Sequence, residues 1–230
     1  KITTNSAVET TEMMLSNGIK LVFKPTTFKK DEISLRAFSD GGLSKVKDVA
    51  DLPSAMMASG IVGNNGLGAF NQIDLNKALT GKIASVSAFI DLYSEGFDGN
   101  SSVKDFETML QLIYLNFTAP RKDDNSFKAL INMYSASLVN RASDPRSAFS
   151  DTVSTWVTNN HPRNVIVNID MLQKVDQEKA IAFFKERFAV PADFTFVFTG
   201  NVNPDDEAVK NAVLTYLGGL KSKKKTEKFT

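Results

Sequence analysis

Side chains that could carry acid-base or metal chemistry are few in this sequence. His161, in the segment NNHPRN beside Arg163, is the one histidine, and there is no cysteine. A zinc site made by this chain alone would need His161 together with carboxylates, because protein zinc is held by Cys, His, Asp and Glu. No G-x-S-x-G nucleophile motif accompanies the histidine. We therefore expect His161 to close local hydrogen bonds in a loop; an independent enzyme using His161 and carboxylates is the weaker alternative.

Four carboxylates are candidates for paired acid-base work, namely Glu95, Asp98, Asp105 and Glu107. The first two lie on a predicted hairpin bounded by glycines. The other two lie at the start of a predicted helix, where Ser102 and Asp105 resemble a capping box. We expect solvated or capping roles for all four.

The stretch DLPSAMMASGIVGNNGLGAF, residues 51–70, is rich in glycine. Glycine lets a backbone approach a phosphate, but these glycines follow a predicted helix and no GK[ST] is present. They are interpreted as helix-ending and turn residues. Met56 and Met57, like Met13 and Met14 near the start, are interpreted as core filler and not as an adaptable binding surface.

Composition excludes several classes of protein. With 230 residues, 42% of them hydrophobic, the chain is long enough for one large domain. Lys and Arg total 27 against 26 for Asp and Glu, so no overall field favours nucleic acid or an acidic membrane surface. No apolar run approaches the roughly 20 residues that span a bilayer. The start has neither an initiator Met nor a signal-type apolar core, which indicates a piece of a longer protein.

Hydrophobic periodicity predicts strands and helices in separate groups, which is typical of an α+β fold with a mainly antiparallel sheet of about five to six strands covered by helices. We expect residues 1–14 to be a polar lead-in from an upstream region, 15–220 to form the domain, and 221–230 to be a Lys-rich linker. The predicted strands are IKLVFKP, EISLRAFS, the hairpin of KIASVSAFID with LYSEGFDGNS, and DFTFVFTG. Helices are predicted from Val46 to Ile61, broken by Gly60 and Gly63, from Ile73 to Leu79, over FETMLQLIYLNF, from Asp124 to Asn140, from Asp144 to Trp156 and from Asp176. A last helix is opened by Asn203-Pro204 and closed by Gly218-Gly219.

The order of several stretches resembles the insulinase/pitrilysin-type zinc peptidase family. The resemblance runs from about Leu15 to Leu220. It is carried by LSNGIKLVFKPTTFKKDEISLRAFSDGG, NNGLGAF, YSEGFDGNSSVKDFETMLQLIYLNFTAPRKD, NRASDP, FTFVFTGNVNPDD and YLGGL.

Active members of that family carry H-x-x-E-H on the helix after the first two strands and a third ligand, Glu, on a later helix. Here the first helix is VADLPSAMMASG, without histidine or glutamate, and FKALINMYSASLVNRAS has no carboxylate between Asp124 and Asp144. No catalytic or metal-binding residue is therefore expected, and the sequence assigns no substrate-binding residue. An R-E-x-x-x-x-Y-like motif, which the resemblance associates with the fourth domain, is also absent.

These departures make the chain resemble the first domain of the inactive C-terminal half of a bacterial zinc protease, the third of four similar domains. The resemblance implies packing against an active half that holds zinc, a chamber for peptide or small-protein substrates, and a periplasmic or secreted location. The alternative is a non-catalytic interaction module, like the core subunits of respiratory complexes. An H-x-x-E-H elsewhere in the full-length protein would favour the peptidase hypothesis, and its absence would favour the interaction module.

Overall fold

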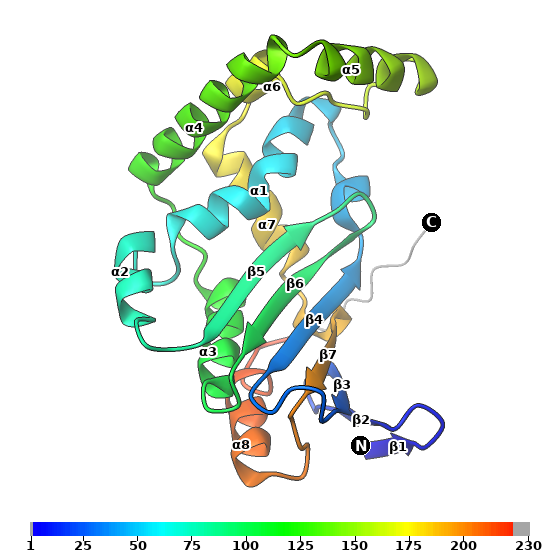
Figure 1. The fold of residues 1–230 in the computed structure, drawn as a ribbon, viewed down its shortest axis with the longest axis vertical. Helices are drawn as coiled ribbons and strands as arrows, with labels where there is room; N and C mark the ends of the chain where they lie inside the picture. Colours follow the sequence, from blue (N-terminus) through cyan, green and yellow to red (C-terminus); the bar gives the residue numbers. More distant parts are fainter. Residues whose placement is uncertain (1, 223–230) are drawn as a thin grey trace.

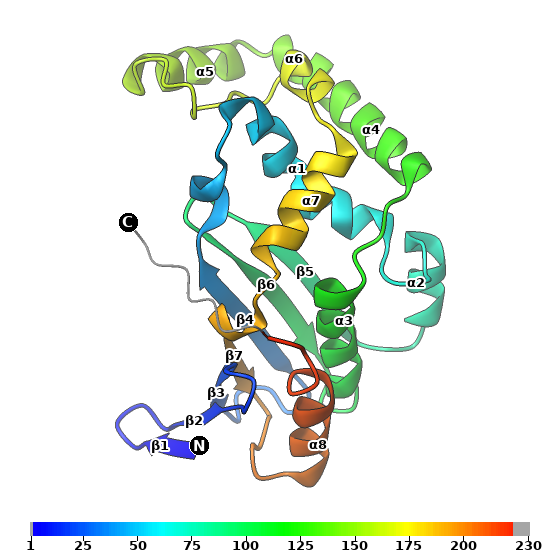
Figure 2. The ribbon, with the colours of Figure 1, turned by 180° about the vertical axis from the view of Figure 1, so that it is seen from behind.

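A seven-stranded sheet with helices packed on one side forms the framework of the chain (Figures 1 and 2). The computed structural model describes residues 2–222. The strand order is β1-β2-β3-β7-β4-β6-β5, and every pairing is antiparallel except that of β3 with β7. The α+β class is confirmed, with a sheet slightly larger than expected. The strands are β1 Ile2–Asn5, β2 Thr10–Met14, β3 Lys20–Pro25, β4 Ile33–Asp40, β5 Ala84–Ile90, β6 Ser94–Ser101 and β7 Thr195–Gly200.

Most helices lie where the periodicity of the sequence places them, but α1 begins at Leu52 and not at Val46, α8 begins at Glu207 and not at Asn203, and α6 was not expected. Asp144 accepts hydrogen bonds from the N–H groups of Arg146 and Ser147, and Asp176 from that of Lys179, so the expected helix starts at these two residues are confirmed. No helix within residues 2–222 has the length and apolar character needed to cross a bilayer. The helices are α1 Leu52–Asn65, α2 Gln72–Ala78, α3 Phe106–Thr118, α4 Asp124–Ala142, α5 Pro145–Val157, α6 Ile169–Gln173, α7 Gln177–Arg187 and α8 Glu207–Tyr216.

The middle of the sheet differs from the prediction. The first two predicted strands, IKLVFKP and EISLRAFS, follow one another in the sequence and were expected to open an antiparallel sheet, but β7 lies between β3 and β4, parallel to β3 and antiparallel to β4. Phe196 and Phe198 of β7 are fully buried, and the Phe198 ring stacks on Phe23 with centroids 5.3 Å apart. Burial of these rings favours the insertion because each large aromatic side chain removes much apolar surface from water.

The N-terminal residues also differ from expectation. Residues 2–14, predicted as a polar lead-in, form the hairpin of β1 and β2, and β2 pairs with β3 through Met13 and Leu21. Met13 packs against the core, whereas Met14 is 45% exposed, so the core interpretation holds for Met13, Met56 and Met57 and is wrong for Met14. Most of the predicted linker, from residue 223 onward, lies outside the described residues.

Helix α1 continues past the two glycines that were predicted to break it. Gly60 and Gly63 lie within the helix, and it ends at Gly66, whose φ is 84°. A Cβ at Gly66 would come within 2.3 Å of the Phe70 carbonyl oxygen, so only glycine fits there. Ile61 and Val62 are fully buried beside the internal glycines, and this packing outweighs the helix-propensity cost of about 1 kcal/mol per glycine.

We predict opposite effects for alanine at the two kinds of glycine. Gly66→Ala should lower the free energy of unfolding by about 1–3 kcal/mol, because alanine is strained at positive φ and its Cβ meets backbone. Gly63→Ala should raise it by about 0.5–1 kcal/mol, since a Cβ there meets nothing within 4 Å. Urea unfolding followed by circular dichroism measures both. Destabilisation by Gly63→Ala would contradict the open space at that position.

Candidate functional site

The helix that corresponds to the family's metal-binding helix is α1, and its inner side is apolar. The helix is preceded by a turn in which Asp48 accepts a hydrogen bond from the Ala50 N–H at 2.9 Å. It packs against α4 and α7. The side chains it buries include Ala55, Met57, Ala58, Ile61 and Val62.

The helix expected to supply the third ligand, α4, buries Leu130 and Leu138. Within residues 2–222 no three His, Cys, Asp or Glu side chains lie close enough together to hold a metal ion. Around α1, the positions expected to bind zinc in an active relative carry packing side chains.

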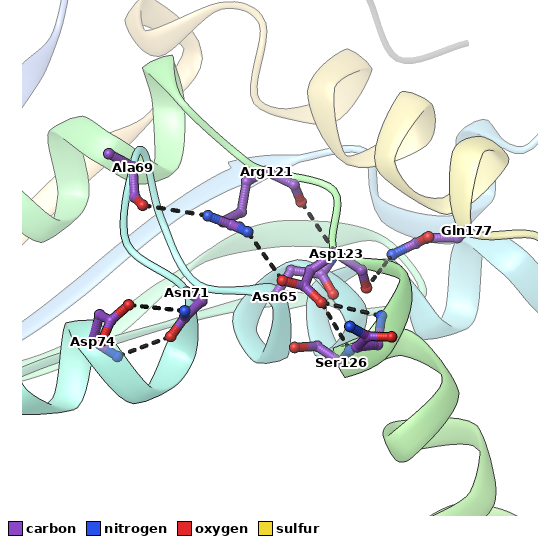
Figure 3. A network of polar contacts seen from close by, with 9 residues as sticks. Asn65, Ala69, Asn71, Asp74, Arg121, Asp123, Ser126 and Gln177 are labelled. Carbon is purple, nitrogen blue, oxygen red and sulfur yellow. Dashed lines mark hydrogen bonds and ion pairs between the residues drawn. The ribbon is translucent and has the colours of Figure 1, made fainter.

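A network of polar residues lies at the C-terminal end of α1 (Figure 3). Asn65 is fully buried, and its Nδ2 donates to the Arg121 carbonyl at 3.1 Å. The Arg121 guanidinium pairs with Asp123 at 3.0 Å and donates to the Ala69 carbonyl at 3.4 Å. These contacts tie the glycine-rich loop after α1 to the segment that enters α4.

Asp123 is the centre of this network. Its carboxylate accepts from the N–H groups of Asn125 and Ser126, at 3.1 and 2.9 Å, and its carbonyl accepts from Gln177 of α7 at 3.0 Å. The Ser126 N–H is the main reason that the pKa of Asp123 lies below its usual range, with Arg121 acting in the same direction. Asp123 is therefore an ionised cap of α4 that also contacts α7. It was not among the candidate residues, although Asp at the start of a predicted helix is a capping signal.

His161 has the loop role expected from the sequence. It is exposed, its Nδ1 accepts from the Arg163 N–H at 3.2 Å, and its own N–H donates to the Thr158 carbonyl at 3.0 Å. The Arg163 guanidinium donates to the Val46 carbonyl at 2.7 Å. The pair fastens the loop after α5 to the segment before α1.

The structure does not bring the candidate carboxylates of β6 together. Glu95 and Asp98 are three residues apart on one strand, so their side chains point to opposite faces of the sheet. Asp98 is exposed and pairs with Arg36 across the strands, as expected of a solvated residue. Glu95 is only 2% exposed, which contradicts its predicted solvated or capping role.

Glu95 is held inside the protein by two groups that the sequence does not reveal. The Gly42 N–H donates to its carboxylate, and Nη1 of Arg187, from the last turn of α7, lies 4.0 Å from it. Arg187 is itself 5% exposed. A buried carboxylate needs such partners because its desolvation is costly.

The two remaining carboxylates stabilise the fold. Asp105 accepts from the Ile83 N–H and from the Ser102 hydroxyl, both at 2.8 Å. The expected contact between Ser102 and Asp105 is present, but it closes the turn before α3, and the Asp105 side chain caps no N–H of that helix. The Ile83 and Ser102 donors, the backbone one first, hold the pKa of Asp105 below its usual range. Glu107 accepts from the Tyr216 hydroxyl at 2.8 Å and links α3 to α8.

We expect Arg187→Met to lower the free energy of unfolding by roughly 3–5 kcal/mol, because it removes a cation from beside a buried carboxylate. Combining it with Glu95→Gln should recover part of that loss. Arg36→Met, which breaks the exposed pair with Asp98, serves as the control and should cost no more than about 1 kcal/mol. Denaturant unfolding of the four proteins measures these values, and strictly additive effects of the two buried changes would contradict the coupling.

We expect the stabilising effect of the Asp105 carboxylate to disappear in acid. Its pKa is lowered on folding, so its contribution is complete above about pH 4 and is lost as the pH falls through the folded-state value. Asp105→Asn should therefore reduce the Tm at pH 7 and reduce it less at pH 3. Asp98→Asn is the control on the exposed face. An undiminished gap between wild type and Asp105→Asn at pH 3 would refute the assignment.

Comparison with known proteins places this geometry in a family. No model of a known protein family matches the sequence. A zinc protease PQQL-like protein of Arabidopsis thaliana is 30% identical over 216 residues, which cover 93% of this chain and 20% of the relative. The crystal structure of the periplasmic protease PqqL from Escherichia coli has a TM-score of 0.80 at 20% identity, covering 98% of this chain and 24% of that one. A peptidase M16 inactive domain from Pseudomonas fluorescens has a TM-score of 0.74 at 14% identity, over 96% of this chain and 53% of that one.

The chain thus spans about a fifth of its curated relative and about a quarter of the Escherichia coli protease. The two solved structures share the fold of this chain, and the Arabidopsis relative agrees with its sequence over 93% of this chain. The sequence lacks the family's H-x-x-E-H and its later glutamate ligand. This chain is a domain of the insulinase-type zinc peptidase family.

Proposed function

We propose that the domain forms part of the wall of a substrate chamber in a larger zinc peptidase and packs against an active half that holds the zinc. One observation carries the proposal: the two helices expected to supply ligands, α1 and α4, pack against each other, and the residues they bury, such as Met57, Ile61 and Leu130, are apolar. The domain would then share the fold of an active relative without its chemistry. Such a domain contributes surface and shape to a site completed by another domain.

The lengths of the relatives support a place as one of four similar domains, with residues 15–220 plus the N-terminal hairpin as the unit. The chain covers 24% of the Escherichia coli protease and 53% of the Pseudomonas fluorescens chain, fractions expected of one unit in four and one in two. The third position follows from the resemblance to the inactive half. Peptides or small proteins are the proposed substrates. A periplasmic or secreted location is proposed by analogy with the periplasmic Escherichia coli protease.

Zinc content and peptidase activity test this function. The 230-residue chain should bind no stoichiometric zinc and should cleave no unfolded peptide, since it has no ligand cluster within its described part. The full-length protein should contain zinc and lose peptide cleavage with a chelator. A full-length variant with Gln in place of the H-x-x-E-H glutamate is the matched control and should keep zinc while losing activity.

Stoichiometric zinc and chelator-sensitive cleavage by the 230-residue chain alone would contradict the proposal. A full-length protein without H-x-x-E-H and without zinc would instead favour the interaction module. His161→Ala should leave both measurements unchanged, because the side chain only closes a loop.

A further inference from the structure

A groove of about 600 Å³ lies between α1, α2 and the edge strand β5. Figure 1 shows α2 beside the start of β5, with α1 crossing above. Residues that line the groove include Gly60, Gly63, Gln72, Leu75, Val86 and Asn116. The buried residues Met57, Ile61 and Leu130 are not among those that line it.

Strand β5 turns a row of backbone groups toward this groove. In the antiparallel pairing with β6, the Ser102 N–H donates to Ile83 and the Asp91 N–H donates to Ser94, so odd-numbered residues of β5 bond to β6. Alternate residues of a strand direct their N–H and C=O groups to opposite sides. The groups of Ala84, Val86 and Ala88 therefore face the outer edge, where the described residues place no further strand.

The sequence of β5 lacks the protection that edge strands usually carry. Exposed edges are normally blunted by lysine, proline, a bulge or a short length, because unpaired backbone groups bind other strands. β5 spans seven residues, ASVSAFI, without a charge or a proline. The opposite edge strand, β1, has four residues.

The glycines of α1 keep this groove open. Gly60 and Gly63 are exposed and line it, and a Cβ at either position meets nothing within 4 Å. No packing contact requires them, although each costs the helix about 1 kcal/mol relative to alanine. On the groove wall formed by α2, Oε1 of Gln72 is buried and has no hydrogen-bond partner within the described residues. A donor from a segment bound in the groove would satisfy this acceptor.

We propose that this groove binds an extended polypeptide segment, which pairs with β5 as an added strand and places small or β-branched side chains against Gly60 and Gly63. This inference rests on the proposed function: the domain would hold substrate without cleaving it. The edge groups of Ala84, Val86 and Ala88 repeat every ~6.8 Å, the spacing of a paired strand. The groove residues named above carry no charge, which disfavours a phosphate or nucleic-acid ligand.

Peptide binding to the 230-residue chain tests the inference. The probe is a fluorescein-labelled ten-residue peptide of alternating Thr and Val flanked by lysines, followed by fluorescence anisotropy. The control peptide has the same side chains but is N-methylated at its four central residues, which removes donors on both of its edges. We expect at least tenfold weaker binding of the control, a difference of about 1.4 kcal/mol. Bound peptide should also slow amide hydrogen exchange at Val86 and Ala88.

A size series at one glycine separates groove filling from unfolding. Gly63→Leu should weaken peptide binding at least about tenfold while keeping or raising the Tm, because leucine favours helix more than glycine does. Gly63→Ala should change binding less than about threefold. Ala129→Leu adds the same side chain at an exposed position of α4 and should leave binding unchanged.

Absence of binding by the wild-type chain, equal binding of the N-methylated peptide, or unchanged binding by Gly63→Leu would each overturn the inference. None of these results bears on zinc content or cleavage, so the zinc and peptidase measurements test the proposed function independently.

Discussion

Insertion of β7 between β3 and β4 is the interaction on which the sheet depends. β7 is the strand that joins the N-terminal group, β1 to β3, to the group of β4, β6 and β5. Its Phe196 and Phe198 are fully buried, and Phe198 contacts both Phe23 of β3 and Phe106 of α3. The pairing of Lys20 with Thr195 links distant parts of the chain. Such long-range pairing slows folding, because loop closure precedes the stabilising contacts.

The helical layer is fixed to this sheet mainly by aromatic packing. The ring centroid of Phe188, the C-cap residue of α7, lies 4.8 Å from that of Phe97 in β6 and 5.4 Å from that of Phe194, which leads into β7. Helix α1 is then joined to α7 where the Ser54 hydroxyl accepts from the Asp176 N–H at 2.9 Å. The position of α1 is thus set by side-chain packing and helix caps. A metal is unnecessary for its placement, which explains how the fold persists without zinc ligands.

The sequence predicts the local elements well and the long-range arrangement poorly. Periodicity and capping residues such as Asp144 and Asp176 define helices because the relevant contacts lie within a few residues. The place of β7, and the partners of Glu95 from Gly42 and Arg187, depend on contacts between distant segments that leave no local pattern. Helix α6, with five residues, is too short to show a period. The expected absence of zinc ligands concerns residue types at motif positions, and it stays a prediction.

The two sides of α1 obey different constraints. On the inner side, Ala58, Ile61 and Val62 are fully buried, and any large or charged replacement there would disturb the packing with α4 and α7. On the groove side, Gly60 and Gly63 together cost the helix about 2 kcal/mol relative to alanines, and no neighbour within this domain requires them. Stability of the isolated domain therefore explains the inner side alone. The segment proposed to bind beside β5 would supply a constraint on the groove side, because side chains larger than glycine at Gly60 and Gly63 would fill the space it needs.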